Sequence, residues 1–419
     1  MEKIAFLFTG QGAQYVGMGK TFYDEYTIAK QTFEEANDIL GFDLAKICFE
    51  GPLGELAKTE NTQPALLTAS IAAYRVYMQE IGLTPQFSAG HSLGEYSALV
   101  SAGAMKFSDA IKIVRQRGLF TKEIVDTGEG GMTIIDGMEK DIIENECRKL
   151  SDKNKKVIIN CYNSPTQFAI AGHQDLVEQV ETAMLDNDAQ ITPLIGGAPF
   201  HTPLMKPAAD KLNLELRQYR FYQFKWPIIS NVTGKPYREP EKIVDTLTLQ
   251  FANPVQWQST MDYLKKRGIT VAVEMGPQNV LTKLVRANTP EIQAFCFGMK
   301  EDRNEIMELL SNDMNNRKDK PTVVTRSMAA AVATPNVNFD KEEYQKGVIE
   351  EYKKLQQLQE QLETDGKAPT AEQMKEAFGT LKVIFDTKRV PREEQEDWFQ
   401  QIIDETGTFY TLKDFSVFE

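Results

Sequence analysis

Residues 90–103 read GHSLGEYSALVSAG, and this stretch decides the fold. A weak strand pattern at 85–89 precedes it, and a helical pattern at 95–102 follows it. A Gly-x-Ser-x-Gly turn between a strand and a helix is a nucleophile elbow, because its glycines permit a tight turn that lifts the serine hydroxyl to the N-terminus of the helix. Ser92 is therefore the candidate nucleophile, although five residues alone also fit an ordinary strand-to-helix turn.

On both sides of the elbow, short apolar runs alternate with helical segments. Residues 4–8 (IAFLF) form a continuous apolar run that ends in the glycine-rich turn GQGAQ at 10–14, as a buried parallel strand entering a loop does. Alternation of strands and helices is typical of an α/β protein with a parallel sheet. Further segments of this pattern are helices at 63–80 and 108–124, strands at 227–230 and 271–274, and a helix at 280–287.

The pattern is interrupted between residues 128 and 196. Short apolar runs alternate there with charged helical stretches, which indicates a small inserted α+β subdomain with an antiparallel sheet. We therefore expect a large subdomain formed by 1–127 and 197–312, with the small subdomain at 128–196. Residues 313–338 are rich in Asn, Lys, Thr, Ala and Pro, which predicts a linker before a helical C-terminal extension at 339–419.

Three amphipathic helices are expected in the extension. Apolar residues keep a helical period from 344 to 362 behind Asp340 as N-cap, and from 374 to 385 behind Thr370, where Gln373 completes a capping box. Apolar residues at 398–403 mark the third helix.

Composition excludes several classes of protein. The 47 basic and 60 acidic residues give a net charge of −13, which argues against binding to a nucleic acid backbone or an anionic membrane. The four cysteines lie far apart without metal-ligand spacing, so neither a metal site nor a disulfide framework is expected. No apolar run approaches the roughly 18 residues of a membrane span. We expect a soluble, cytoplasmic protein.

A nucleophilic serine needs a base, and the chain has three histidines. His91 adjoins Ser92 and is a poor partner, because consecutive side chains leave a sharp turn in different directions. His173 lies in the expected small subdomain and fits a surface loop. His201 follows the Gly/Pro-shaped loop 197–200 and is the candidate base by elimination, with an incidental histidine as the alternative that spacing leaves open.

Eight motifs together resemble those of the malonyl-CoA:acyl carrier protein transacylases, the acyltransferase family of fatty acid and polyketide synthesis. The resemblance covers about residues 1–310 and extends to the discrete, trans-acting enzymes of polyketide and hybrid peptide/polyketide synthesis. It implies a hydrolase-like α/β core with an inserted ferredoxin-like subdomain. The motifs, in order, are GQGAQ (10–14), TQPAL (62–66), GHSLGEYSALVSAG (90–103), RQRG (115–118), APFH (198–201), PIISNVTG (227–234), NPVQW (253–257) and EMGP (274–277).

The resemblance implies a ping-pong transfer of malonyl from malonyl-CoA to the phosphopantetheine thiol of an acyl carrier protein. Ser92 would form a malonyl ester and His201 would accept its proton. The backbone N–H groups of Gln11 and Leu93 would form the oxyanion hole, and the carbonyl of Gln250 would orient the histidine. No cofactor is expected, since phosphopantetheine belongs to the partner.

Substrate selection is implied by a second set of residues. Arg117 would pair its planar guanidinium with the free malonyl carboxylate, with Gln63 and His91 close to the substrate. Arg115 is expected to be solvated or in a surface pair. Phe200 would exclude an α-methyl group and so favour malonyl. Thr121-Lys122 depart from the family's usual Met-Gln, which leaves an unusual extender unit open.

Other functions remain as alternatives. A proofreading acyl hydrolase shares the fold but characteristically lacks the arginine; a non-catalytic recruiting subunit or a generic serine esterase would not need the full motif set. The extension either packs its helices on the catalytic body or docks a carrier protein or synthase module. Carrier proteins are usually acidic, so a local basic surface is expected near the site, with Lys283 and Arg286 as candidates.

Overall fold

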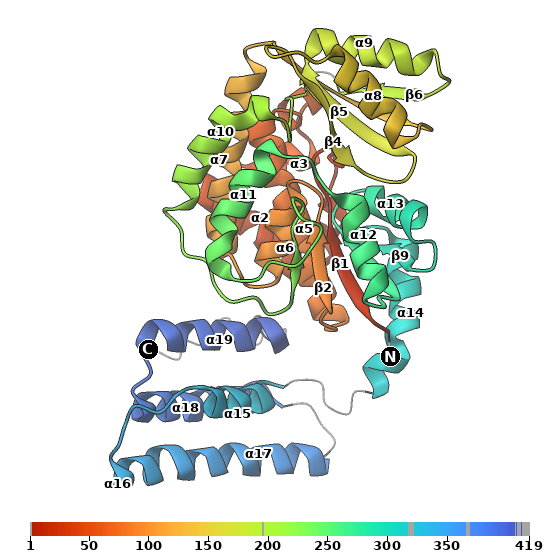
Figure 1. Cartoon of the computed structure of the whole chain (residues 1–419). Helices are drawn as coiled ribbons and strands as arrows, with labels where there is room; N and C mark the ends of the chain where they lie inside the picture. Colours follow the sequence, from red (N-terminus) through yellow and green to blue (C-terminus); the bar gives the residue numbers. More distant parts are fainter. Residues whose placement is uncertain are drawn as a thin grey trace. The chain divides into compact units, whose positions relative to one another are not determined.

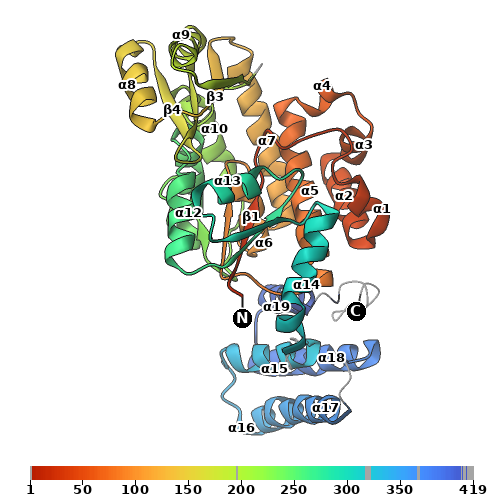
Figure 2. The same cartoon turned by 90° about the vertical axis from the view of Figure 1, so that its right-hand side faces the viewer.

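The apolar run at 4–8 forms strand β1 (Ile4–Phe8), which is buried along its whole length. The computed structural model (Figures 1 and 2) describes residues 2–194, 197–316, 322–365, 369–406, 408 and 412. The chain divides into two compact units, residues 1–77 with 84–310 and residues 78–83 with 311–419. The first unit contains both sheets.

The central sheet has five strands in the order β7-β2-β1-β8-β9, all parallel. Phe8 pairs with Gly90 of β2 and with Met275 of β8, so these three strands end level with one another. Parallel strands place the loops that follow them at one edge, where α/β proteins build their sites. The other strands are β2 (Phe87–Gly90), β7 (Ile228–Ile229), β8 (Val271–Met275) and β9 (Gln293–Cys296).

Helices cover both faces of this sheet (Figure 2). Ala5 and Leu7 belong to the cluster formed with α12 and α13, whereas the Phe6 ring contacts Tyr77 of α5. The helices of this unit are α1 (Lys20–Glu25), α2 (Thr27–Leu40), α3 (Leu44–Phe49), α4 (Leu53–Leu56), α5 (Thr59–Glu80), α6 (Gly94–Ser101), α7 (Phe107–Val125), α10 (Lys206–Leu216), α11 (Ile243–Ala252), α12 (Trp257–Lys266), α13 (Val280–Asn288) and α14 (Lys300–Asn316).

A second, antiparallel sheet lies within the stretch 128–196, with strand order β4-β5-β3-β6 and a core of its own. Its element order, β-α-β-β-α-β, is that of a ferredoxin-like unit. The backbone of β4 also bonds to Val255, which ties this sheet to the body. The elements are β3 (Gly130–Asp136), α8 (Lys140–Leu150), β4 (Val157–Tyr162), β5 (Gln167–His173), α9 (Gln174–Leu185) and β6 (Gln190–Pro193).

The second unit is helical. The prediction of a linker at 313–338 is wrong, because the described residues of this stretch include helical segments. Helix α14 runs to Asn316, and α15 (Val323–Ala333) begins at a capping box formed by Thr322 and Thr325. Four small apolar residues of α15 are buried in this unit's core: Val323, Val324, Ala330 and Ala331. Because these side chains are few and small, the apolar period of this helix is weak in the sequence. The remaining elements are α16 (Lys341–Tyr344), the π-helical turn η3 (Gln345–Glu350), α17 (Glu351–Asp365), α18 (Ala371–Lys388) and α19 (Arg392–Thr406).

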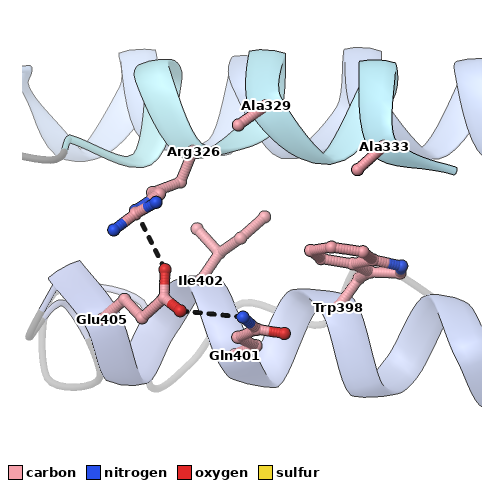
Figure 3. A pocket seen from close by; sticks show the side chains of 7 residues that line it. All are labelled: Arg326, Ala329, Ala333, Trp398, Gln401, Ile402 and Glu405. Carbon is pink, nitrogen blue, oxygen red and sulfur yellow. Dashed lines mark hydrogen bonds and ion pairs between the residues drawn. The ribbon is translucent and has the colours of Figure 1, made fainter. Parts of the chain in front are cut away.

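Two details show how this unit is held together. The caps predicted at Asp340 and Thr370 are present, the latter with the Gln373 capping box. The buried Lys388 ammonium donates to the carbonyls of Ala331 and Thr334 and so caps the end of α15. A hollow of about 190 Å³ between α15 and α19 has apolar side chains such as Trp398 and Ile402 in its walls. Arg326 and Glu405 also line it and form an ion pair at 2.9 Å (Figure 3). Among the described helices, none is long and apolar enough to cross a membrane.

Candidate active site

The elbow closes so tightly that its glycines admit no side chain. A Cβ on Gly94 would lie 2.0 Å from the carbonyl oxygen of Phe8, and one on Gly90 would lie 1.9 Å from the carbonyl carbon of Gly94. Ser92 itself has φ 52°, in the left-handed region that non-glycine residues rarely occupy. Strain of this kind is typical of functional sites whose surroundings fix the backbone.

The structure brings Ser92 and His201 together across 109 residues of chain. Ser92 Oγ lies 2.6 Å from His201 Nε2, and His201 Nδ1 lies 2.7 Å from the carbonyl oxygen of Gln250. A carbonyl only accepts, so Nδ1 carries the proton and Nε2 is left to accept from the serine hydroxyl. Burial first, then the Arg117 charge, lowers the pKa of His201 to about 3. The imidazole is therefore a neutral base at physiological pH.

The loop after β1 lies directly against the elbow. A Cβ on Gly10 would lie 2.3 Å from the carbonyl oxygen of His91, which is why this position needs glycine. The next residue is Gln11, whose N–H has no acceptor among the described residues, and the same is true of the Leu93 N–H. Two unused N–H groups beside a nucleophile are the donors an oxyanion requires.

Arg117 of α7 is almost completely buried, at 1% exposure, and lies among aromatic rings. Its guanidinium carbon is 4.5 Å from the Phe251 centroid, 5.6 Å from Tyr96 and 5.7 Å from Phe200. Its Nε and Nη2 have no hydrogen-bond partner, nor do either of the side-chain polar atoms of the fully buried Gln63. Burial lowers the pKa of Arg117, whereas Tyr96 and Glu95 oppose that shift. Buried cationic donors without partners in the protein are suited to bind an anionic group.

The expectation that the Arg115 side chain is solvated or forms an ion pair at the surface is wrong. It is partly buried, donates to the carbonyl of Glu60 at 2.5 Å and to Asn61 Oδ1 at 2.6 Å, and lies over the Phe42 ring. The Glu60 carbonyl is free because Pro64, inside α5, lacks the N–H that would bond four residues back. Arg115 thus repairs the helix that carries Gln63.

Comparison of the sequence with families of known proteins agrees with this geometry. The family model described as "Acyl transferase domain" matches residues 5–331. The chain belongs to this acyl transferase family.

Named relatives of this acyl transferase narrow the description. It is 37% identical to a Bacillus subtilis protein named malonyl CoA-acyl carrier protein transacylase, over 94% of this chain and 99% of the relative. An Escherichia coli K12 protein of the same name is 43% identical over 74% of this chain and 100% of its own. A solved structure titled as a type II PKS acyl-carrier protein in complex with its malonyl-transacylase matches with TM-score 0.71 and 38% identity, covering 73% of this chain and 99% of that one. Likeness thus extends past residue 310, where the resemblance drawn from the motifs ends, and into the extension.

The remaining predicted residues of this acyl transferase also fall near the site. Phe200 is buried, and its carbonyl accepts from Asn160 Nδ2 of β4 at 2.9 Å. His91 Nε2 lies 2.9 Å from Asn163 Oδ1 and its ring 5.4 Å from that of Trp257, while burial lowers the pKa of His91. His91 therefore packs within the elbow.

The other residues named from the sequence make ordinary structural contacts or lie at the surface. The buried Thr121 hydroxyl donates to the Arg117 carbonyl, and Lys122 lies 3.7 Å from the Glu60 carboxylate. His173 is half-exposed at the end of β5. Lys283 and Arg286 are exposed on α13. The part of the chain that the structure describes contains no cluster of residues able to hold a metal ion.

Two further residues at the site of this acyl transferase were not predicted from the sequence. Asn231 Oδ1 accepts from the Ser92 N–H at 2.6 Å, and its Nδ2 donates to the Gly90 carbonyl. Glu95 is fully buried and accepts from Asn231, Gln250 and Tyr237. Asn231 belongs to the motif PIISNVTG and Glu95 to the motif around the elbow, so both motifs were visible but these roles were not.

Proposed function

We propose that the chain transfers malonyl from malonyl-CoA to the phosphopantetheine thiol of an acyl carrier protein. The observation that carries this proposal is Arg117, a buried cation with unpaired nitrogens beside the Ser92–His201 pair. A guanidinium presents two parallel donors that match a carboxylate, and malonyl is an acyl group with a free carboxylate. Gln63 adds unpaired polar atoms to the same substrate site.

In the first half-reaction, Ser92 Oγ attacks the thioester carbonyl while its proton moves to His201 Nε2. The tetrahedral oxyanion forms against the N–H groups of Gln11 and Leu93. The carbon–sulfur bond then breaks, His201 returns the proton to the CoA sulfur, and a malonyl-serine ester remains. The carrier thiol reverses these steps, with His201 taking the thiol proton. No cofactor is required, because each step needs only acid–base and hydrogen-bonding groups.

Selection among acyl groups rests on Arg117 and Phe200. An acetyl group leaves the guanidinium unpaired in a buried site, which is unfavourable. The Phe200 ring centroid lies 5.7 Å from the guanidinium carbon, which supports the proposal that this ring excludes an α-methyl group. Malonyl is therefore the proposed extender unit.

The partner is an acyl carrier protein of a polyketide or hybrid peptide/polyketide synthase, and the enzyme acts in the cytoplasm. The exposed Lys283 and Arg286 are the proposed contacts for an acidic carrier. Replacing both by alanine should raise the KM for the carrier and leave malonyl-serine formation unchanged. An unchanged carrier KM contradicts this surface.

Intact mass after exposure to malonyl-CoA tests the proposal. The wild-type chain should gain one malonyl group and Ser92→Ala none, while Arg117→Ala should lose preference for malonyl over acetyl. An adduct that persists in Ser92→Ala contradicts the nucleophile. Faster clearance of acetyl from a carrier than loading of malonyl identifies a proofreading hydrolase instead.

A further inference from the structure

Glu95 lies in the first turn of α6, three residues after the nucleophile, and its side chain has no exposed surface. One carboxylate oxygen accepts from the Asn231 N–H at 3.2 Å and from Gln250 Nε2 at 3.1 Å, and the other accepts from the Tyr237 hydroxyl. Three donors to one carboxylate, with the Arg117 charge nearby, offset only part of the cost of burying it, since burial still raises the pKa of Glu95 to about 7. The proposed transfer assigns this group no step.

Two of these donors belong to residues that hold the nucleophile. The Asn231 side chain accepts from the Ser92 N–H, and Gln250 Nε2 donates to the Ser92 carbonyl at 2.7 Å. Ser92 has φ 52°, a conformation that persists only when its neighbours fix it. Asn231 and Gln250 therefore clamp the strained residue on both sides, and Glu95 binds both members of the clamp.

The same hydrogen-bond network also includes His201, the proposed base. The Gln250 carbonyl accepts from His201 Nδ1, so one residue joins the histidine to the carboxylate. A carboxylate only accepts, so it requires the nitrogen of the Gln250 side chain on its own side. The other amide atom, Gln250 Oε1, is buried without a hydrogen-bond partner. The orientation of the Gln250 side-chain amide is therefore set by the hydrogen bonds of its nitrogen.

Electrostatics add a second reason. Proton transfer from Ser92 makes His201 an imidazolium beside the buried Arg117 cation, whose charge lowers the pKa of His201. No carboxylate forms an ion pair with His201 among the described residues, and its Nδ1 meets a backbone carbonyl. Glu95 is the buried negative group connected to it through a single residue.

We propose that Glu95 is a positioning residue for the transfer reaction. Through Gln250 and Asn231 its carboxylate fixes Ser92 and the carbonyl that orients His201, and its charge stabilises the imidazolium. An acid in direct contact with histidine has this role in a Ser-His-Asp arrangement. The inference rests on the proposed transferase function.

Glu95→Gln in the full chain tests it. Glutamine keeps the size of the side chain and leaves an oxygen for Asn231 and Gln250. Its amide nitrogen donates to the Tyr237 hydroxyl instead of accepting from it, so the variant removes the charge and reverses this one hydrogen bond. The single-turnover rate of malonyl-serine formation should fall about 10- to 100-fold. The KM for malonyl-CoA should stay within about threefold, because Arg117 and Gln63 are untouched.

Glu274→Gln is the matched control. Glu274 is also buried, and its carboxylate accepts from the N–H groups of Leu281 and Thr282 and from the Thr282 hydroxyl, far in sequence from the elbow. Glutamine cannot satisfy all of these donors, so this variant should melt at a lower temperature than Glu95→Gln. Its rate at a temperature where it is folded should match that of the wild type.

A pH profile separates positioning from a purely structural role. Burial raises the pKa of Glu95 to about 7, so acid converts the wild type to the neutral side chain that glutamine imitates. The charged or titratable groups that interact with Glu95 are Arg117, Tyr96 and Tyr237. The pKa values of both tyrosines lie above 10, and Arg117 stays protonated. The wild-type rate should therefore approach that of Glu95→Gln as pH falls through about 7.

The outcomes are distinct. If Glu95→Gln forms the adduct at the wild-type rate from pH 5 to 8, the positioning role is wrong while the proposed function stands. If the wild-type chain forms no Ser92 adduct at all, the proposed function fails and this inference fails with it. A folded Glu95→Gln that is slow at pH 8 and converges with the wild type in acid supports it.

Discussion

Replacing Arg115 by alanine tests how α5 is held in place. The Glu60 carbonyl, at 2.5 Å from the guanidinium, would lose its partner, and Pro64 offers no N–H in exchange. A buried acceptor without a partner costs about 1–3 kcal/mol. The contact with the Phe42 ring contributes about 0.5–1 kcal/mol more. Because Arg115 is only partly buried and water can replace some of its contacts, the expected loss is about 2 kcal/mol.

The second substitution makes this prediction specific. Pro64→Ala restores an N–H four residues after Glu60, which can bond the freed carbonyl and return about 1 kcal/mol in the Arg115→Ala background. The same substitution should gain little in the wild type, where Arg115 already occupies that carbonyl.

Urea unfolding followed by tryptophan fluorescence measures the cycle. A Trp398→Phe background leaves only Trp226 and Trp257, both in the first unit, so the signal reports on that unit. The control is Lys112→Ala, at an exposed position on α7, the helix that carries Arg115. It should change the free energy of unfolding by less than about 0.5 kcal/mol. If Arg115→Ala and Pro64→Ala add within about 0.3 kcal/mol, Arg115 does not serve the carbonyl that proline frees.

Three further predictions address the substrate, the elbow and the second unit. Arg117→Met should lower kcat/KM for malonyl-CoA about 100-fold or more and spare acetyl-CoA, since charge-assisted bonds to the carboxylate are lost. Because the Arg117 charge lowers the pKa of His201, its removal should also raise that pKa; in the Glu95→Gln background, where Glu95 no longer titrates, the acid limb of the pH–rate profile should move upward, and an unmoved limb argues against the coupling. Gly94→Ala should abolish soluble folded protein, because its Cβ would lie 2.0 Å from the Phe8 carbonyl oxygen, whereas Gly54→Ala, with open space around it, should express normally. Lys388→Met should destabilise the second unit by about 1–3 kcal/mol by leaving the Ala331 and Thr334 carbonyls without their donor, as hydrogen exchange in α15 would report, with unchanged malonyl-serine formation.

The sequence was sufficient for residues whose roles follow from local geometry or from an ordered motif. The elbow depends on glycines at 90 and 94, which are only four positions apart in the chain, and the strand of residues 4–8 is a plain apolar run. Ser92, His201 and the Gln250 carbonyl were expected together, and the structure brings them within hydrogen-bond distance.

Other features depend on how side chains from distant segments meet, which no single segment records. Asn231 meets the Ser92 N–H across 139 residues, and Tyr237 meets Glu95 across 142. Arg115 looked like a surface residue because its partner, the Glu60 carbonyl, is made available only by Pro64. The sequence predicts a linker where helix α15 lies, because alanine and threonine give a weak apolar period, although Thr322 and Thr325, which form its capping box, are both present in the sequence.

The extension is separable from the chemistry. The residues placed at the candidate site lie between positions 10 and 257, and the Escherichia coli relative, matched over its whole length, covers only 74% of this chain. The Bacillus subtilis relative covers 94%, so the extension is shared by some relatives that carry the same name and absent from others. Its described helices have a core and caps of their own. Because α14 runs to Asn316, removal of the extension for any test of carrier docking should begin after that residue rather than at 313, where the cut would shorten a helix that begins in the first unit.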